Sequence, residues 1–421
     1  MANSGEQHNR CLIARRLILV LVSIIALSGA TSQSLKAQRY SVPYSFPGGP
    51  EGWLPIAGMI TDEDGNLYGT TWGGGDWENG TVFKVDRHGN ETVLYSFQGG
   101  TDGALPAAAL VRDKEGNLYG TTTIGGAYYG TVFKLDSNGV ETVLYSFTGF
   151  ADGGNPQAGL VRDRAGNLFG TTLSGGTSGF GAVFTVDTTG HETVLHSFTA
   201  TGGDGAFPYA GLIEDQEGNL YGTTFGGGAY GSGTVFKVTA HGDTSILYSF
   251  TGAADGAGPV GSLVRDRRGR LFGTTFRGGD QSVMCNGYLG CGTVFELTPS
   301  GTERMLYSFT GGADGANPAA GLVRDPAGNL YGTTQFGGAW PCSGLGCGTV
   351  FTVSRNGKET VLHAFTGGTD GSNPEAGLTR NGANLYGTTP FGGVYSAGTL
   401  FKLKRSERSI EEGPDDAGDV K

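Results

Sequence analysis

The sequence predicts an all-β fold, a seven-bladed β-propeller of four-stranded blades, and three observations lead to this prediction. A hexapeptide, Asn-Leu-Tyr-Gly-Thr-Thr at 66–71, recurs with small variations in seven copies at steps of 50 to 59 residues. Each repeat holds short apolar segments joined by tight turns, and the two ends of the repeated region carry complementary parts of one unit. Tandem units that cannot bury their apolar faces alone, and whose ends complete each other, are typical of a closed ring.

The composition is that of a folded chain, although turn-forming residues are abundant. The 421 residues include 80 Gly and 15 Pro, but 37% are hydrophobic and 10% are aromatic, which is too apolar for disorder. The net charge is −11. Unspecific nucleic-acid binding needs clustered Lys and Arg, so we expect no nucleic-acid partner.

Residues 1–37 have the pattern of a signal peptide. Three arginines precede an apolar run at 17–27, and small residues near 30 and 37 offer two cleavage sites. A single membrane anchor is the alternative, but the run is well short of the roughly 20 apolar residues that a spanning helix needs. We therefore expect a secreted, periplasmic or cell-surface protein with no membrane insertion after cleavage.

The repeat itself predicts four strands. In the second copy the segments rich in Val, Leu, Tyr, Phe and Thr are 108–112, 117–122, 130–135 and 141–147. Residues 113–116 and 136–139 join them, each starting with Asp and ending with Gly, as in a tight hairpin turn. Four strands joined by such turns form one propeller blade.

The ends of the repeated region predict how the ring closes. A lone fourth-strand segment at 40–46 precedes the first full repeat, and the last repeat stops after its third strand, 398–403. Pairing these segments would remove the open sheet edges of a linear array. The propeller is thus predicted to span 38–404, and 405–421 to be an acidic, polar, disordered tail.

These repeats resemble the GloVer repeat of bacterial exported proteins over nearly all of residues 40–404. The Asp-x-x-Gly-Asn-Leu-Tyr stretch is also similar to blades of NHL-type, regulator-type and streptogramin-lyase-like propellers. By this resemblance the Ala-Gly-Leu-Val segment is the innermost strand and the Tyr-Ser-Phe segment the outermost. The resemblance carries over no activity.

The resemblance also defines two faces of the ring. The turn face carries the Asp-x-x-Gly turns, such as 113–116 and 136–139. The loop face carries the loops after each second strand, such as 123–130, and the crossings to the next blade, such as 148–157. Six crossings have an Asp, as at Asp102, and the first has Glu51 instead. One Asp per blade is too few for a Ca²⁺ site, so we expect each to cap its own turn and predict no cofactor.

Patterns of enzymes are weak in this sequence. The six histidines have no metal-ligand or triad spacing, and His196 and His363 replace the Tyr of Tyr-Ser-Phe. Residues 226–231 match a dinucleotide-binding loop but precede a strand where a helix is required. The sequence thus favours a protein without catalytic or metal-binding residues.

Four cysteines lie in the enlarged loops of the fifth and sixth repeats. Cys285 and Cys291 bracket one loop, and Cys342 and Cys347 bracket the other. In an exported protein this arrangement predicts two local disulfides. Cross-pairing between the two loops and a zinc site of all four cysteines are the alternatives.

All four tryptophans lie on the predicted loop face, where the repeats differ most: Trp53, Trp72, Trp77 and Trp340. We predict that they bind a ligand, although neutral variation of tolerant loops would give the same pattern. The leading hypothesis is a monomeric, non-catalytic exported scaffold for a polysaccharide or protein. A propeller lyase or hydrolase with a loop-borne site, and a structural protein of the cell envelope, are the alternatives.

Overall fold

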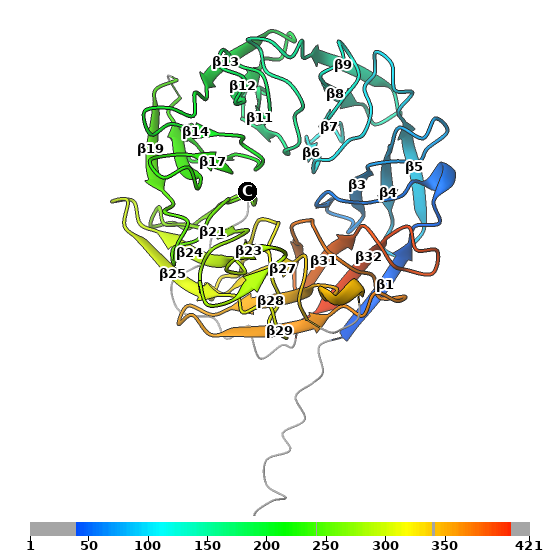
Figure 1. Cartoon of the computed structure of the whole chain (residues 1–421). Coiled ribbons are helices and arrows are strands. Elements are labelled where there is room, and N and C mark those ends of the chain that lie inside the picture. Colours follow the sequence, from blue (N-terminus) through cyan, green and yellow to red (C-terminus); the bar gives the residue numbers. More distant parts are fainter. Residues whose placement is uncertain (1–38, 241, 339–341, 406–421) are drawn as a thin grey trace, which may run out of the picture.

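The computed structural model describes residues 39–240, 242–338 and 342–405, which form seven four-stranded antiparallel sheets arranged in a ring (Figure 1). This confirms the predicted seven-bladed β-propeller. The expectations for the signal peptide, for the tail after residue 405 and for Trp340 lie outside the described residues. None of the helices described is long and apolar enough to cross a membrane.

The blades follow one another along the chain, and each runs from an innermost to an outermost strand. Blade one contains β2 (Ile60–Thr61), β3 (Leu67–Thr71), β4 (Thr81–Val85) and β5 (Glu91–Ser96). Blade two contains β6 (Val111–Arg112), β7 (Leu118–Thr122), β8 (Thr131–Leu135) and β9 (Glu141–Ser146). Blade three contains β10 (Val161–Arg162), β11 (Leu168–Thr172), β12 (Ala182–Val186) and β13 (Glu192–Ser197). Blade four contains β15 (Ile213–Glu214), β16 (Leu220–Thr224), β18 (Thr234–Val238) and β19 (Thr244–Ser249).

The remaining blades follow the same order. Blade five contains β20 (Val264–Arg265), β21 (Leu271–Thr275), β24 (Thr293–Leu297) and β25 (Glu303–Ser308). Blade six contains β26 (Val323–Arg324), β27 (Leu330–Thr334), β28 (Thr349–Val353) and β29 (Glu359–Ala364). Blade seven contains β30 (Thr379–Asn381), β31 (Asn384–Thr389), β32 (Thr399–Lys404) and β1 (Arg39–Ser45). The loop face adds two short pairs, β14 (Gly205–Ala206) with β17 (Gly226–Gly227) and β22 (Met284–Cys285) with β23 (Tyr288–Leu289), and two 3₁₀ turns, Gly49–Glu51 and Cys342–Gly344.

Blade seven closes the ring as predicted. The N-terminal strand β1 pairs antiparallel with β32, with Tyr40 opposite Leu403 and Ser45 opposite Thr399. In Figure 1 blue β1 lies beside red β32. Phe46 follows β1, is fully buried, and its ring meets that of Phe83 in blade one edge to face at 5.1 Å. The first strand therefore seals the sheet edge and also packs against the next blade.

The hydrophobic core lies between neighbouring blades. Phe97 of blade one and Phe133 of blade two meet edge to face, with ring centroids 5.1 Å apart, and this pair recurs around the ring. The hexapeptide glycine is required for this packing, because a Cβ at Gly120 would lie 2.7 Å from the Phe133 ring. The Thr hydroxyl that follows also links blades, since Thr70 donates to the Ala108 carbonyl at 3.2 Å. The hexapeptide residues are therefore part of the core between blades.

The innermost strands are shorter than the sequence predicted. Residues 108–112 were expected to form one strand, but β6 holds only the last two of them. The carbonyl of Ala108 bonds to Thr70 of the preceding blade, so this segment joins blades instead of extending its own sheet. Together with its equivalents it lines a central cavity of about 330 Å³.

The described region includes the first residue of the predicted tail. Arg405 is only 4% exposed, and its Nη1 lies 3.1 Å from Asp325 Oδ2 and 3.0 Å from the Tyr331 hydroxyl of blade six. Its guanidinium lies over the Tyr331 ring, the place that Arg162 takes over Tyr119 between blades two and three. Arg405 thus contributes to the packing between the last two blades.

Candidate functional site

The strongly exposed aromatic side chains of the described part of the chain all lie on the loop face. They are found in the loops after the second strands and in the crossings. The two most exposed are Tyr128 at 86% and Phe150 at 76%. The set is Trp77, Tyr128, Tyr129, Phe150, Phe207, Tyr209, Tyr230, Tyr288, Phe391 and Tyr395. Exposed aromatic side chains gathered on one face are typical of a binding surface.

The predicted tryptophans do not form one cluster. Trp53 and Trp72 are half-buried and pack edge to face with ring centroids 5.7 Å apart, and Trp53 Nε1 donates to Glu78 Oε2 at 3.3 Å. Trp77 is 60% exposed and lies over a separate groove of about 590 Å³ along the outer strand β5. The position of Trp340 is not among those described. Of the predicted residues, Trp77 is therefore the one most available to a ligand.

A ring of variable side chains surrounds the loop-face mouth of the central cavity. Each follows the crossing proline and precedes an Ala or Gly in the cavity wall, and the set is Ile56, Ala107, Gln157, Tyr209, Val260, Ala319 and Glu375. The wall is thus nearly uniform, whereas its entrance differs from blade to blade. The sequence analysis missed this ring, although a variable position between an invariant Pro and a small residue was visible in the repeat.

Two groups of side chains lie at or beside this mouth. Burial raises the pKa of the Glu375 carboxyl, although a hydrogen bond to its Oε1 from Gln335 Nε2, at 2.7 Å, opposes the shift. Next to the mouth, the Phe225 ring packs edge to face on Tyr209, with ring centroids 5.7 Å apart. Arg277 lies between the rings of Phe225 and Tyr288, 4.7 and 4.6 Å from their centroids. Such contacts hold a cation and two aromatic rings in place before any ligand arrives.

The cysteines form the two predicted local disulfides, Cys285 with Cys291 and Cys342 with Cys347. Each bridge packs beneath the following crossing, where a Cβ at Gly311 or Gly367 would lie within 3 Å of a sulfur atom. Cross-pairing and a four-cysteine zinc site are therefore wrong. In the ranges that the structure describes, no group of three or more His, Cys, Asp or Glu side chains is placed to hold a metal ion.

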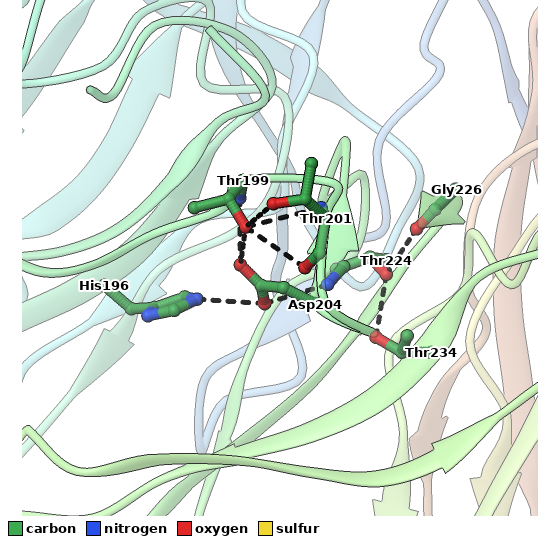
Figure 2. Close-up of polar contacts among 8 residues, drawn as sticks. His196, Thr199, Thr201, Asp204, Thr224, Gly226 and Thr234 are labelled. Carbon is green, nitrogen blue, oxygen red and sulfur yellow. Dashed lines mark hydrogen bonds and ion pairs between the residues drawn. The ribbon is translucent and has the colours of Figure 1, made fainter. Parts of the chain in front are cut away.

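The crossing aspartates cap their own turns, as predicted. Asp102 Oδ2 accepts hydrogen bonds from the Gln98 backbone N–H at 2.7 Å and from the Tyr95 hydroxyl at 3.0 Å. In blade three a histidine replaces the tyrosine, and His196 Nε2 lies 3.2 Å from Asp204 Oδ1 (Figure 2). The crossing aspartate therefore bonds either to a tyrosine hydroxyl or to a histidine ring nitrogen.

The His196 group resembles a catalytic triad in composition but not in geometry. Figure 2 shows Thr199 bonded to Asp204 and not to His196. The Thr199 hydroxyl lies 3.1 Å from Asp204 Oδ2, so the imidazole is not placed to activate the hydroxyl as it does in a triad. Burial alone would raise the pKa of Asp204, but hydrogen bonds from His196 and from the Thr199 N–H outweigh it and lower that pKa. This arrangement stabilises an ionised turn aspartate.

The fold and its single tandem repeat define a seven-bladed β-propeller with a variable loop face. The family model of the Gloeobacter/Verrucomicrobia repeat matches residues 29–224 and 209–412, so the chain belongs to this repeat family. No curated protein sequence matches the chain.

Solved structures are similar to this chain at low sequence identity. The extracellular domain of a putative one-component system from B. thetaiotaomicron is similar over 86% of this chain, with 11% identity and a TM-score of 0.55. This chain spans only 39% of that neighbour's length. A putative gluconolactonase (12% identity, 65% of this chain and 80% of the other, TM-score 0.40) and a putative oxidoreductase from Thermus thermophilus (13%, 87% and 100%, 0.41) are more distant. The likeness to the extracellular domain, at 11% identity, shows the fold alone.

Proposed function

We propose that this chain is an exported, non-catalytic propeller that binds a polysaccharide or a protein through its loop face. The observation that carries the proposal is the restriction of the exposed aromatic side chains to that face. Aromatic rings offer large contact areas that stack on sugar rings and dominate protein interfaces. The turn face of the described chain exposes Val140 among its large apolar side chains, but no aromatic ring.

The disulfides support an oxidising compartment. The two bridges join cysteines that lie six and five residues apart in the sequence, within the loops of blades five and six. Disulfides persist in secreted and periplasmic proteins and are rare in the cytosol. The Cys285–Cys291 bridge also closes the loop that carries Tyr288, which reduces the conformational entropy that this loop loses when a ligand binds.

A propeller lyase or hydrolase is the second candidate, and Glu375 is the group that favours it. Its carboxyl has a raised pKa and lies at the mouth of the central cavity, as expected of a general acid. The other six residues of the mouth ring are Ile, Ala, Gln, Tyr, Val and Ala, so that ring supplies no second carboxylate. A Glu375→Gln variant that retains binding but loses product formation would favour the enzyme.

The test is a binding screen of the folded protein against polysaccharide and peptide arrays, followed by variants of the two faces. Trp77→Ala and Tyr128→Ala should each weaken binding by about 2 kcal/mol, or roughly 30-fold, the size of an aromatic hot spot. Val140→Ala is the matched control, because Val140 is 59% exposed on the turn face and Trp77 is 60% exposed on the loop face. Unchanged affinity of both aromatic variants, with a loss in Val140→Ala, would overturn the proposal.

A further inference from the structure

The turn face holds two equivalent cavities of opposite charge. In most blades the hexapeptide tyrosine donates to the turn aspartate, as Tyr68 does to Asp62 at 2.9 Å. Blades three and five have Phe169 and Phe272 at this position instead. Beside each phenylalanine a cavity of about 370 Å³ lies between that blade and the next one.

The cavity between blades three and four is acidic. Its ionisable lining residues are Asp163, Asp187 and Glu214. The cavity between blades five and six, here called the arginine pocket, is lined by six arginines and only two carboxylates: Arg267, Arg268, Arg270, Arg304, Arg324, Arg355, Asp266 and Glu296. Two cavities of the same size at the same place in the repeat thus carry opposite charge, so the fold itself does not require the arginines.

One arginine of the pocket, Arg270, replaces the asparagine that begins the hexapeptide in the other repeats. All six other blades have Asn at the position of Arg270, and in five of them it caps the turn aspartate, as Asn117 caps Asp113. Arg270 instead bonds to Asp266 at 2.6 Å and to Glu296 at 2.8 Å. The two carboxylates therefore fix this guanidinium inside the cavity.

Other arginines are oriented around the same centre. Arg304 Nη2 lies 2.5 Å from the second oxygen of Glu296. Blades one, two, four and seven have a lysine at the position of Glu296. The guanidinium groups of Arg270 and Arg324 lie over the Phe272 ring, 5.3 and 5.9 Å from its centroid. The phenylalanine thus acts as an apolar floor on which two planar cations stack.

We propose that the arginine pocket binds a small polyanion with closely spaced oxyanion groups, either carboxylates or phosphates. Even without Arg324 and Arg355, four guanidinium groups line the cavity against two carboxylates, in a chain whose net charge is −11. Guanidinium groups bind carboxylate and phosphate oxygens in pairs through parallel N–H donors. The cavity volume falls within the range of small-molecule sites. The pocket lies on the face opposite the proposed loop-face site and is independent of it.

The test is isothermal titration of the folded protein with inorganic pyrophosphate and, separately, with citrate at low ionic strength. We expect a dissociation constant of about 1 mM or below for at least one of them, with an affinity that falls as salt is added. Binding of pyrophosphate alone assigns phosphate groups to the ligand, and binding of citrate alone assigns carboxylates.

Variants test whether anion binding depends on the arginine pocket or on any arginine of the turn face. Arg267 and Arg268 are exposed, so replacing both by Ala should leave the melting temperature unchanged and weaken binding at least tenfold. Arg164→Ala is the matched control, since Arg164 holds the turn position of Arg267 in blade three, beside the acidic cavity. The proposal is overturned if neither anion binds at 10 mM, or if Arg164→Ala weakens binding as much as the double variant.

Discussion

The contacts between outer strands should make the stability of this propeller depend on pH. Five glutamates begin outer strands, and four of them face the crossing aspartate of the preceding blade: Glu141, Glu192, Glu303 and Glu359, while Glu91 faces Glu51. Burial, and then the charge of Asp102, raise the pKa of Glu141 from 4.5 to about 7. Its Oε1 is buried and has no hydrogen-bond partner among the described residues.

Two blades lack this glutamate, so the blades can be compared with one another. These five glutamates follow blades whose outer strand carries Tyr, whereas the two blades with histidine are followed by Thr244 and Tyr40 at the glutamate position. His196 and His363 each lie 3.2 Å from their crossing aspartate. A neutral residue therefore stands at the glutamate position wherever the preceding blade has histidine in place of tyrosine.

The sign of the pH effect follows from the raised pKa. A carboxyl that binds its proton more tightly when folded contributes stability below pH 4.5, and this contribution is lost as pH rises through 7. A shift of this size corresponds to about 3 kcal/mol if it is fully transmitted. Because Glu141 is only about half buried, solvent screening reduces our expectation to about 1 kcal/mol per glutamate.

The perturbation is Glu141→Gln, which resembles the protonated side chain at every pH. Thermal unfolding followed by circular dichroism should show no change at pH 5 and an increase in melting temperature of about 1 to 2 °C at pH 8. Replacing all five glutamates should raise the shift several-fold. The exposed turn residue Glu115 provides the control, because Glu115→Gln should leave both temperatures unaltered. Equal destabilisation by Glu141→Gln at both pH values would refute the reasoning.

Three further predictions concern the ring. Deleting residues 39–46 should open the edge of β32 and remove cooperative thermal unfolding, and an unchanged transition would show that closure is dispensable. Arg405→Ala should cost about 3 kcal/mol, because it leaves buried Asp325 without its cation; a loss below 0.5 kcal/mol in chemical denaturation would contradict this. Replacing Cys285 and Cys291 by Ser should lower the melting temperature and speed proteolysis of that loop, and identical digestion rates would argue against a structural role.

The architecture was predictable from the sequence because the same pattern of strands and turns recurs in every repeat. The spacing of the hexapeptide gave the number of blades, and the lone segment at 40–46 gave the pairing of β1 with β32. The disulfides followed from two loops that each gained a pair of cysteines. The limits of the innermost strands were wrong, because the Thr70 bond to Ala108 depends on how neighbouring blades pack.

The candidate sites were harder to predict because they depend on contacts between blades. Trp53 and Trp77 both stand in variable segments, yet one packs on a neighbouring ring and the other is exposed. The arginine pocket draws residues from 266 to 355, which a scan for local motifs does not bring together. The substitution of Phe272 for tyrosine was visible in the repeat, but its meaning required the cavity beside it.

The pairing of β1 with β32 also constrains the order in which the protein can fold. Tyr40 and Leu403 face each other across one ladder although almost the whole propeller separates them along the chain. Synthesis from the N-terminus produces β1 first and its partner last, so β1 has no native ladder partner while the intervening blades are completed. Contacts of such large sequence separation form slowly, because the chain entropy of a long loop must be lost before the contact stabilises it. The last event of folding is therefore expected to be ring closure, and until then both edges remain open to strands of other molecules.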